Sequence, residues 1–476
     1  MPTSHAARGQ HSLRRENIFA LTLCCLVALL PLACGDGNHD QNPQFTAQTS
    51  ALPEFAHSTL VRLNTASLAR AVQAGKEIQL PFAYIGGGTA NRKVQLTLRN
   101  MRAADLAAYV LKNGNAGTGT SAPLPPPATY QGRVRNGGSA NFTLTESVVE
   151  GSMLTIDGWA FIEPLEPLLR LRNVSPDTRA QLLKRFNHVV YNVRDLGGHV
   201  LLNDDPGPPQ PVGAKKPSGQ LVMSMVADGD PELLRAYPLD SVMPFWLKQE
   251  TLLNSVDWLY NCIEPEANAD NAYADCGNDF DGGSNAFQAT VRIDRLEVWT
   301  TGGPDSNRAD ISLEQSITMT HQASPVCCGE PHTAGHSSLV HFFSGRGFED
   351  RAGEAWGTGG VNNYGPGCFS TTDRDCHHAI SQLVPTGASS NFTFHGNVFE
   401  QQALVSHEIG HNNNAPEVFT NVCPVCWLFD TQCGNCLMAS QGGFSSMTQY
   451  LYDEQAVVTH MGPLLAERLT SPPVGL

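Results

Sequence analysis

The sequence has no run of basic residues and a deficit of positive charge. Its 476 residues include 30 Lys and Arg against 45 Asp and Glu, a formal net charge of −15. Proteins that bind a phosphate backbone or an anionic membrane surface need clustered basic side chains. We therefore expect neither nucleic acid nor an anionic membrane as a partner. The sequence also lacks internal repeats and heptad runs, which excludes a solenoid or a long coiled coil.

The sequence has no apolar run near its N-terminus that is long enough to span a bilayer comfortably. Two arginines precede an apolar stretch from Ile18 to Ala33, an order typical of a signal peptide, which we place at 1–34. Its end, LPLACG, resembles a bacterial lipoprotein processing site with Cys34 as the acylated residue, and Pro31 stands where that site usually has Leu. The alternative is an ordinary cleaved signal peptide. Both predict an extracytoplasmic protein, either secreted or held at the cell surface or outer membrane by a lipid.

Cysteine is missing between Cys34 and Cys262, whereas ten of the 13 cysteines follow. An even number of cysteines in an oxidising compartment predicts disulfides. Two Cys-x-x-Cys pairs, at 423–426 and 433–436, are six residues apart. This is shorter than most zinc-ribbon spacings, so disulfides are favoured there over structural zinc. The acidic run DFDGG is compatible with Ca²⁺, but a lone acidic turn is more often a solvated loop.

Composition divides the chain into a spacer at 35–55, a mostly β region at 56–200, a linker at 201–220 and a mixed region at 221–470. The linker contains five prolines and a Lys-Lys pair, and it is interpreted either as a maturation cleavage site or as a plain spacer. In the first region, strands are predicted at Leu60 to Leu63, Val94 to Leu98, Tyr130 to Val134, Asn141 to Leu144, Met153 to Ile156 and Val189 to Val193.

The mixed region alternates strand and helix patterns. Strands are predicted at Leu221 to Ala227, Thr290 to Thr300, Ser338 to Phe343 and Gly353 to Gly357. Helices are predicted at Phe245 to Ile263, at Ile311 to Thr320 and from Asn397 onward. This alternation favours an α/β-type second half within an α+β protein.

The helix from Asn397 carries the residues that indicate chemistry. His407 and His411 are four residues apart, so their rings project side by side and can bind one zinc ion. Glu408 follows the first histidine, and its carboxylate is placed to act on a zinc-bound water as a general base. Six further histidines show no second zinc spacing and are interpreted as surface or supporting residues: His332, His336, His341, His377, His378 and His395.

The residues after His411 predict a sharp turn. Three asparagines, which tolerate left-handed backbone angles, end the helix, and Pro416 extends the residue before it. The turn brings Glu417 back toward the metal. We predict Glu417 as the third ligand, because catalytic zinc usually has three protein ligands. The alternative is an exposed loop carboxylate.

HEIGHNNNAPE resembles the metzincin pattern of zinc peptidases, His-Glu-x-x-His-x-x-Gly-x-x-His or Asp. CLMAS, with Met438, resembles the Met-turn of that clan, and Met438 lies 27 residues after His411. Asn414 stands where the clan has Gly, and Glu417 where it has His or Asp. The resemblance implies a metzincin-like domain with a mixed twisted sheet, an active-site helix and one catalytic zinc.

Further segments are similar to the reprolysin or adamalysin-like branch. Its paired third and edge strands resemble SLVHFFSGRGFEDRAGEAWGTGG, and its second strand resembles VRIDRLEVWT. Its segment after the Met-turn resembles GGFSS. TYQGRV, WAFIEPL and NHVVYNV resemble its prodomain. The resemblance implies a zymogen that the prodomain silences by steric occlusion, because this region has no cysteine to supply a thiolate.

The sequence thus predicts a zinc-dependent endopeptidase that hydrolyses peptide bonds in extracellular proteins. One alternative is a metzincin-scaffold surface lipoprotein that binds partners with weak or no catalysis, and another is a metal-dependent amidase acting on non-peptide substrates. Substrate preference, disulfide connectivity and oligomeric state do not follow from the residues. Membrane association is expected only through the N-terminal lipid.

Overall fold

The computed structural model describes the chain at residues 52, 54–112, 120–155, 157–196, 221–237, 245–260, 289–301, 339–348, 352–355, 377–386 and 394–412. All of these belong to the unit Pro43–Leu476. The predicted signal segment, the linker at 201–220, the helix at Ile311 to Thr320, the Ca²⁺ loop and every cysteine lie outside the described residues. Across the described part of the chain, no helix has the length and apolar character needed to cross a bilayer.

The first sheet is antiparallel throughout, with eight strands in the order β1-β10-β9-β8-β7-β6-β3-β2. Its strands are β1 Ser58–Val61, β2 Ile78–Ala83, β3 Thr89–Leu98, β6 Thr129–Val134, β7 Ser139–Leu144, β8 Val149–Thr155, β9 Gly158–Pro164 and β10 His188–Asn192. Three helices and a 3-10 turn accompany them: α1 Thr65–Gln73, α2 Leu165–Leu171, α3 Pro176–Arg185 and η2 Val193–Asp195. The β6–β7 hairpin turns through Asn136 and Gly137, whose φ angles of 73° and 104° suit these two residue types.

The second sheet has seven strands in the order β14-β15-β13-β11-β12-β4-β5. They are β4 Arg102–Lys112, β5 Thr120–Ser121, β11 Leu221–Gly229, β12 Ala289–Thr301, β13 Leu339–Ser344, β14 Gly353–Ala355 and β15 His377–Gln382. The inner strands run parallel, whereas β14 and β5 are antiparallel to their neighbours. The sheet is therefore mixed. The described helices of this half are α4 Pro231–Ala236, α5 Phe245–Tyr260 and α7 Val398–Asn412.

Every strand predicted from the sequence is present, with ends that differ by a few residues, and the predicted helices at Phe245 and Asn397 are α5 and α7. One predicted pairing is wrong. The sequence resemblance placed the edge strand beside the third strand, but β15 lies between β13 and β14. Two strands from the region predicted at 56–200, β4 and β5, extend the second sheet beyond β12. The predicted domain boundary at the linker stays a prediction.

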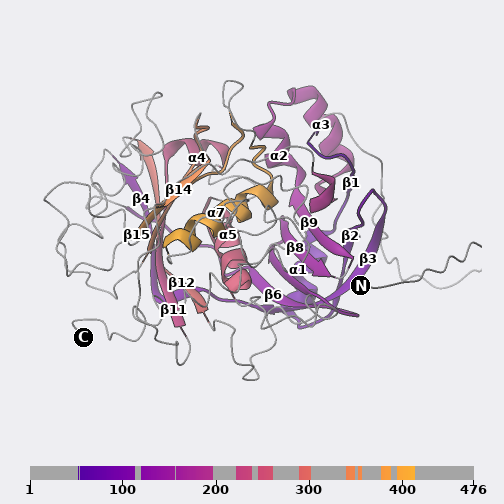
Figure 1. Cartoon of the computed structure of the whole chain (residues 1–476), viewed down its shortest axis with the longest axis horizontal. Helices are drawn as coiled ribbons and strands as arrows, with labels where there is room; N and C mark the ends of the chain where they lie inside the picture. Colours follow the sequence, from indigo (N-terminus) through magenta and orange to yellow (C-terminus); the bar gives the residue numbers. More distant parts are fainter. Residues whose placement is uncertain are drawn as a thin grey trace, which may run out of the picture. The chain divides into compact units, whose positions relative to one another are not determined.

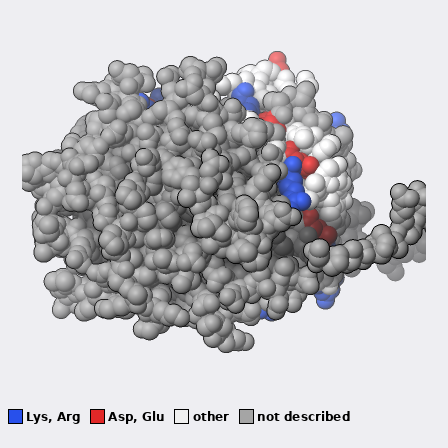
Figure 2. Space-filling model, viewed as in Figure 1, with Lys and Arg blue, Asp and Glu red and all other residues white. Residues whose placement is uncertain are grey.

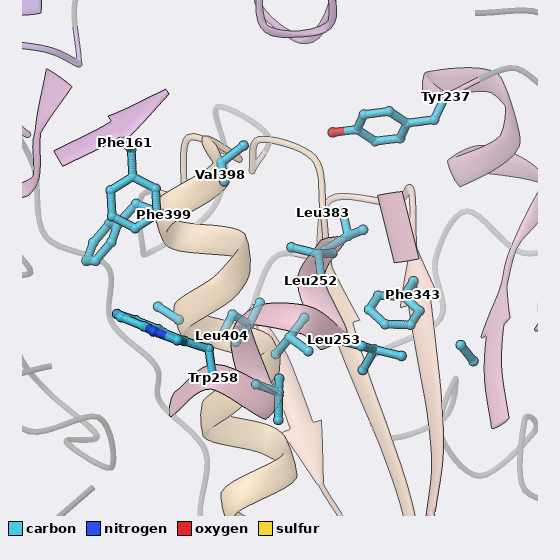
Figure 3. Packing of buried hydrophobic residues seen from close by; sticks show 14 of the residues in the cluster. Phe161, Tyr237, Leu252, Leu253, Trp258, Phe343, Leu383, Val398, Phe399 and Leu404 are labelled. Atoms are coloured by element: carbon cyan, nitrogen blue, oxygen red, sulfur yellow. The ribbon is translucent and has the colours of Figure 1, made fainter. Parts of the chain in front are cut away.

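Helices α5 and α7 pack against each other between the two sheets (Figure 1). Their contact with the first sheet is aromatic: the rings of Phe161 and Phe399 are 5.3 Å apart and those of Trp159 and Trp258 are 5.7 Å apart, centroid to centroid. Figure 3 shows Phe161 next to Phe399 near the start of α7. Such pairs add about 0.5–1.5 kcal/mol each beyond the area that they bury. One apolar core therefore fixes α7 from both sides.

The described charges on the face drawn in Figure 2 alternate in sign, with acidic and basic side chains next to each other. This agrees with the sequence, in which basic residues are scattered.

Candidate metal centre

The start of α7 is fixed by its own side chains. Asn397 precedes the helix, and its Oδ1 accepts a hydrogen bond of 2.9 Å from the backbone N–H of Glu400. The Glu400 carboxylate accepts one of 2.7 Å from the N–H of His395 and lies 2.8 Å from its ring Nδ1. An Asn cap satisfies a helix N–H that would otherwise have no intrahelical partner. These hydrogen bonds fix the residue at which the helix begins.

Two further N–H groups of the first turn are bound by the first sheet. Val398 N donates to a carboxylate oxygen of Glu163 on β9, and Phe399 N donates to the hydroxyl of Tyr191 on β10, both at 3.3 Å. Burial raises the pKa of Glu163 to about 8, against the opposing charge of Lys248. No local sequence pattern indicates this support, because its residues are more than 200 positions away from α7.

Glu163 makes stability depend on pH. The folded-state pKa of Glu163 is about 8, above the ordinary value of 4.5. At a pH between these two values, Glu163 is protonated in the folded protein and ionised in the unfolded chain. The stability from this proton is full below pH about 4.5 and is lost as pH rises through about 8. As pH rises from about 5 to about 8, the unfolding free energy of the wild type should fall relative to that of Glu163→Gln, whose side chain does not titrate. Urea titrations at several pH values measure it, with Glu166→Gln, at a partly exposed position of α2, as the control. A difference that does not change with pH would contradict the assignment.

His407 and His411 lie one turn apart, with their Nε2 atoms 2.9 Å from each other and both rings buried. The ring planes are nearly perpendicular, at 89°, with centroids 4.5 Å apart. In a tetrahedral site, two nitrogens at 2.0–2.1 Å from one zinc are separated by about 3.3 Å. The two imidazoles therefore fit a shared zinc ion with only a small adjustment, and two histidine nitrogens are a donor set that zinc prefers.

Glu408 lies against the edge strand β14. A methyl group built on Gly353 of that strand would approach Glu408 Oε1 to 2.1 Å and Leu404 Cδ1 to 2.8 Å. Gly353 thus leaves a space that the carboxylate occupies. The position of Glu408, next to the imidazole pair and beside an edge strand, is set by this packing of α7 on β14 and β15.

Gly353→Ala is expected to displace Glu408 more than to unfold the protein, because the contacted atoms are the ends of flexible side chains. Overpacking costs typically about 1–3 kcal/mol. If Glu408 is the general base, the rate of hydrolysis should fall about tenfold or more, since a shift of about 1 Å costs up to about a hundredfold. Rates and urea midpoints of variant and wild type test this. An unchanged rate of hydrolysis at equal stability would mean that Glu408 takes no part in the reaction.

The structure brings together His407, Glu408 and His411 and leaves the other predicted site residues untested. Glu417, Met438 and Cys34 lie outside the described residues. Within the described ranges, no group of three or more His, Cys, Asp or Glu is arranged around a common point that could hold a metal ion. The predicted third ligand thus stays a prediction.

A polar pair beneath the site was missed by the sequence reasoning, which interpreted His341 as a surface or supporting residue. His341 on β13 is fully buried, and its Nε2 lies 3.0 Å from Oγ of Ser381 on β15. Burial lowers the pKa of His341 to about 3, which keeps the ring neutral. Ser381 is the register partner of Gly353, so its side chain lies on the sheet face that α7 covers. The sequence feature that indicates burial of His341 is its place in LVHFF, where every neighbouring residue is apolar.

No protein-family model and no curated protein sequence matches the chain at a significant level. Among solved structures, the chain is similar to the crystal structure of metalloproteinase-II from Bacteroides fragilis, with 12% sequence identity and a TM-score of 0.42. The similarity covers 83% of this chain and 94% of that chain.

Proposed function

We propose that the chain is a zinc-dependent endopeptidase of the metzincin type, similar to the reprolysin or adamalysin-like branch. The observation that carries the proposal is the pair of buried imidazoles on α7, with Nε2 atoms 2.9 Å apart, together with the carboxylate that directly follows the first histidine and lies at the edge of a mixed sheet. Buried histidines at this separation satisfy the donor preference and approximate spacing of a zinc site. In this proposal Glu417 is the third ligand and Met438 lies beneath the site.

The bound metal would act as a Lewis acid, lowering the pKa of a water molecule and polarising the scissile carbonyl. His407 and His411 would hold it through Nε2, from a helix whose position is fixed by packing on both sheets. Glu408 accepts the proton of the attacking water on a carboxylate oxygen and then donates it to the nitrogen of the leaving amine. The buried position of Glu408 excludes bulk water from this transfer.

The edge strand β14 supports peptides as the substrate class. Among the described strands it has one neighbour, β15, so its other edge can pair with an extended chain. A peptide bound there would pass next to Gly353, which contacts Glu408. We propose an extended segment of an extracellular protein as substrate.

Further parts of the proposal rest on the sequence. The segment at 1–34 directs the protein out of the cytoplasm, with lipidation at Cys34 or free secretion as the two routes. The region at 56–200 is a prodomain, and the protein is made as a zymogen. The alternative function, a surface lipoprotein that keeps the scaffold without catalysis, differs in that it needs no bound zinc.

Metal removal tests the proposal. We expect one zinc per chain by elemental analysis and hydrolysis of casein that a chelator stops and added Zn²⁺ restores. His407→Ala should lose both the zinc and the activity, whereas His395→Ala, which removes a ring at the other end of α7, should keep the zinc. Absence of zinc supports the binding lipoprotein. Zinc without hydrolysis of any protein or peptide supports an amidase.

A further inference from the structure

The described residues before and after the linker are connected by backbone pairing. We call residues 54–196 the N-terminal region and residues 221–412 the C-terminal region. Strand β4 of the N-terminal region pairs with β12 of the C-terminal region from Ala107 opposite Arg295 to Leu111 opposite Trp299. Outside this ladder, Ile293 N donates to Met101 O at 2.7 Å and Thr300 Oγ1 to Leu111 O at 3.0 Å. Loss of β4 would leave one long side of β12 without its backbone partners.

Ion pairs connect the same two regions along α5. Arg99 binds the fully buried Asp257 through two hydrogen bonds of 2.7 and 2.9 Å. Arg102 binds Glu250, which is 2% exposed, with its second nitrogen at 2.9 Å from the carboxylate. Carboxylates buried to this degree need a charged partner, because an uncompensated buried charge costs about 3–5 kcal/mol. The charged partners of both carboxylates come from the N-terminal region.

Neutral hydrogen bonds fill the space between these ion pairs. Thr143 Oγ1 lies 2.7 Å from Thr251 Oγ1, and Ser255 Oγ donates to Asn141 Oδ1 at 2.9 Å. All four residues are buried. On its side toward the first sheet, α5 therefore carries buried polar side chains that β7 matches, next to the aromatic contact of Trp258 with Trp159. Such complementarity specifies one docking geometry.

The N-terminal region also supports the helix of the candidate metal centre. The first two N–H groups of α7 donate to Glu163 and Tyr191, and the ring of Phe399 packs on Phe161. A C-terminal region alone would lose these partners at the element that positions His407 and His411. The fold therefore needs the N-terminal region at the start of α7.

We propose that the N-terminal region is a permanent partner of the C-terminal region: a cut between residues 196 and 221 yields two polypeptides that stay assembled as one folded particle. The inference goes beyond the proposed peptidase activity and does not depend on it. In the proposed zymogen, the cut itself would then have to relieve the steric occlusion, because the N-terminal region is not released. Cutting the linker opens the chain without removing the strand β4 from the second sheet or the supports of α7.

The test uses the full chain with a recognition sequence for a site-specific protease placed within 201–220. After the cut, we expect both polypeptides to elute together from a size-exclusion column at the position of the uncut protein, with an unchanged circular dichroism spectrum. Separation of the two polypeptides in native buffer, with the C-terminal polypeptide still folded, would overturn the proposal. Precipitation of the C-terminal polypeptide on separation would overturn it too, because the assembly would then not be stable.

Charge reversal makes the test specific to this interface. In the cut protein, Arg102→Glu should speed dissociation of the two polypeptides in dilute urea at least about thirtyfold, since truncating one partner of a buried pair acts mainly on the dissociation rate. Adding Glu250→Arg to the same chain should restore most of the loss. Arg135→Glu is the control, because Arg135 is exposed and pairs with Glu77 inside the N-terminal region. Equal dissociation rates for the Arg102 and Arg135 variants would overturn the proposed role of the interface.

Discussion

Glu408→Gln is expected to reduce peptide hydrolysis by about a hundredfold to ten thousandfold, the range that a positioned general base contributes. The glutamine amide has nearly the same shape, so it fits the space that Gly353 leaves beside β14. It cannot accept the proton of the attacking water. His407 and His411 are unchanged in this variant, and their Nε2 atoms remain available to a metal ion.

The measurement is kcat/KM on an unfolded protein substrate, with zinc content determined on the same samples. Glu400→Gln is a matched control, since Glu400 lies on the same helix two turns earlier and binds His395 instead of the site. We expect the Glu400 variant to retain activity within a few fold and the Glu408 variant to keep its zinc. Near-full activity of Glu408→Gln would exclude the general-base role. Loss of zinc from it would mean that Glu408 supports the metal site.

The sequence predicts those features of the candidate site that depend on a few consecutive residues. The i, i+4 spacing of His407 and His411 is enough to place both rings on one face of a helix, and the structure has them with Nε2 atoms 2.9 Å apart. The strands were also predictable, because apolar runs such as those of β10 and β13 mark buried strands directly. Both signals are contained in a few consecutive residues.

The remaining features depend on contacts between distant residues, which no local pattern encodes. Strand β4 was not predicted: its sequence, RAADLAAYVLK, combines alanines and charges, and it becomes a strand by pairing with β12, almost 190 residues later. Strand β15 begins with two histidines and lacks the apolar run of a buried strand. The support of α7 by Glu163 and Tyr191 likewise arises only when the two sheets meet.

Lys248→Met is expected to destabilise the protein by about 3–5 kcal/mol, because it leaves Glu150 buried without its charge partner. The two side chains, on α5 and β8, form an ion pair that is 2% exposed on each side. Glu163 is near the same ammonium group, which lowers its pKa against the effect of burial. Removing the lysine therefore raises the pKa of Glu163 further and leaves Glu150 as the unpaired buried charge. Urea unfolding at neutral pH measures the loss, and the double variant with Glu150→Gln should recover part of it.

An exposed ion pair on α4 is the control for this variant. Arg235 is 71% exposed and pairs with Glu232 on the same short helix, so Arg235→Met should change stability by less than about 1 kcal/mol. If Lys248→Met costs no more than this control, the buried pair does not hold the two regions together. If it costs several kcal/mol and Glu150→Gln recovers it, the loss comes from an unpaired buried charge and not from the shape of the methionine. That outcome would also explain why α5 keeps charged residues in an interior where apolar ones would pack as well: the charges fix the partner against which the helix docks.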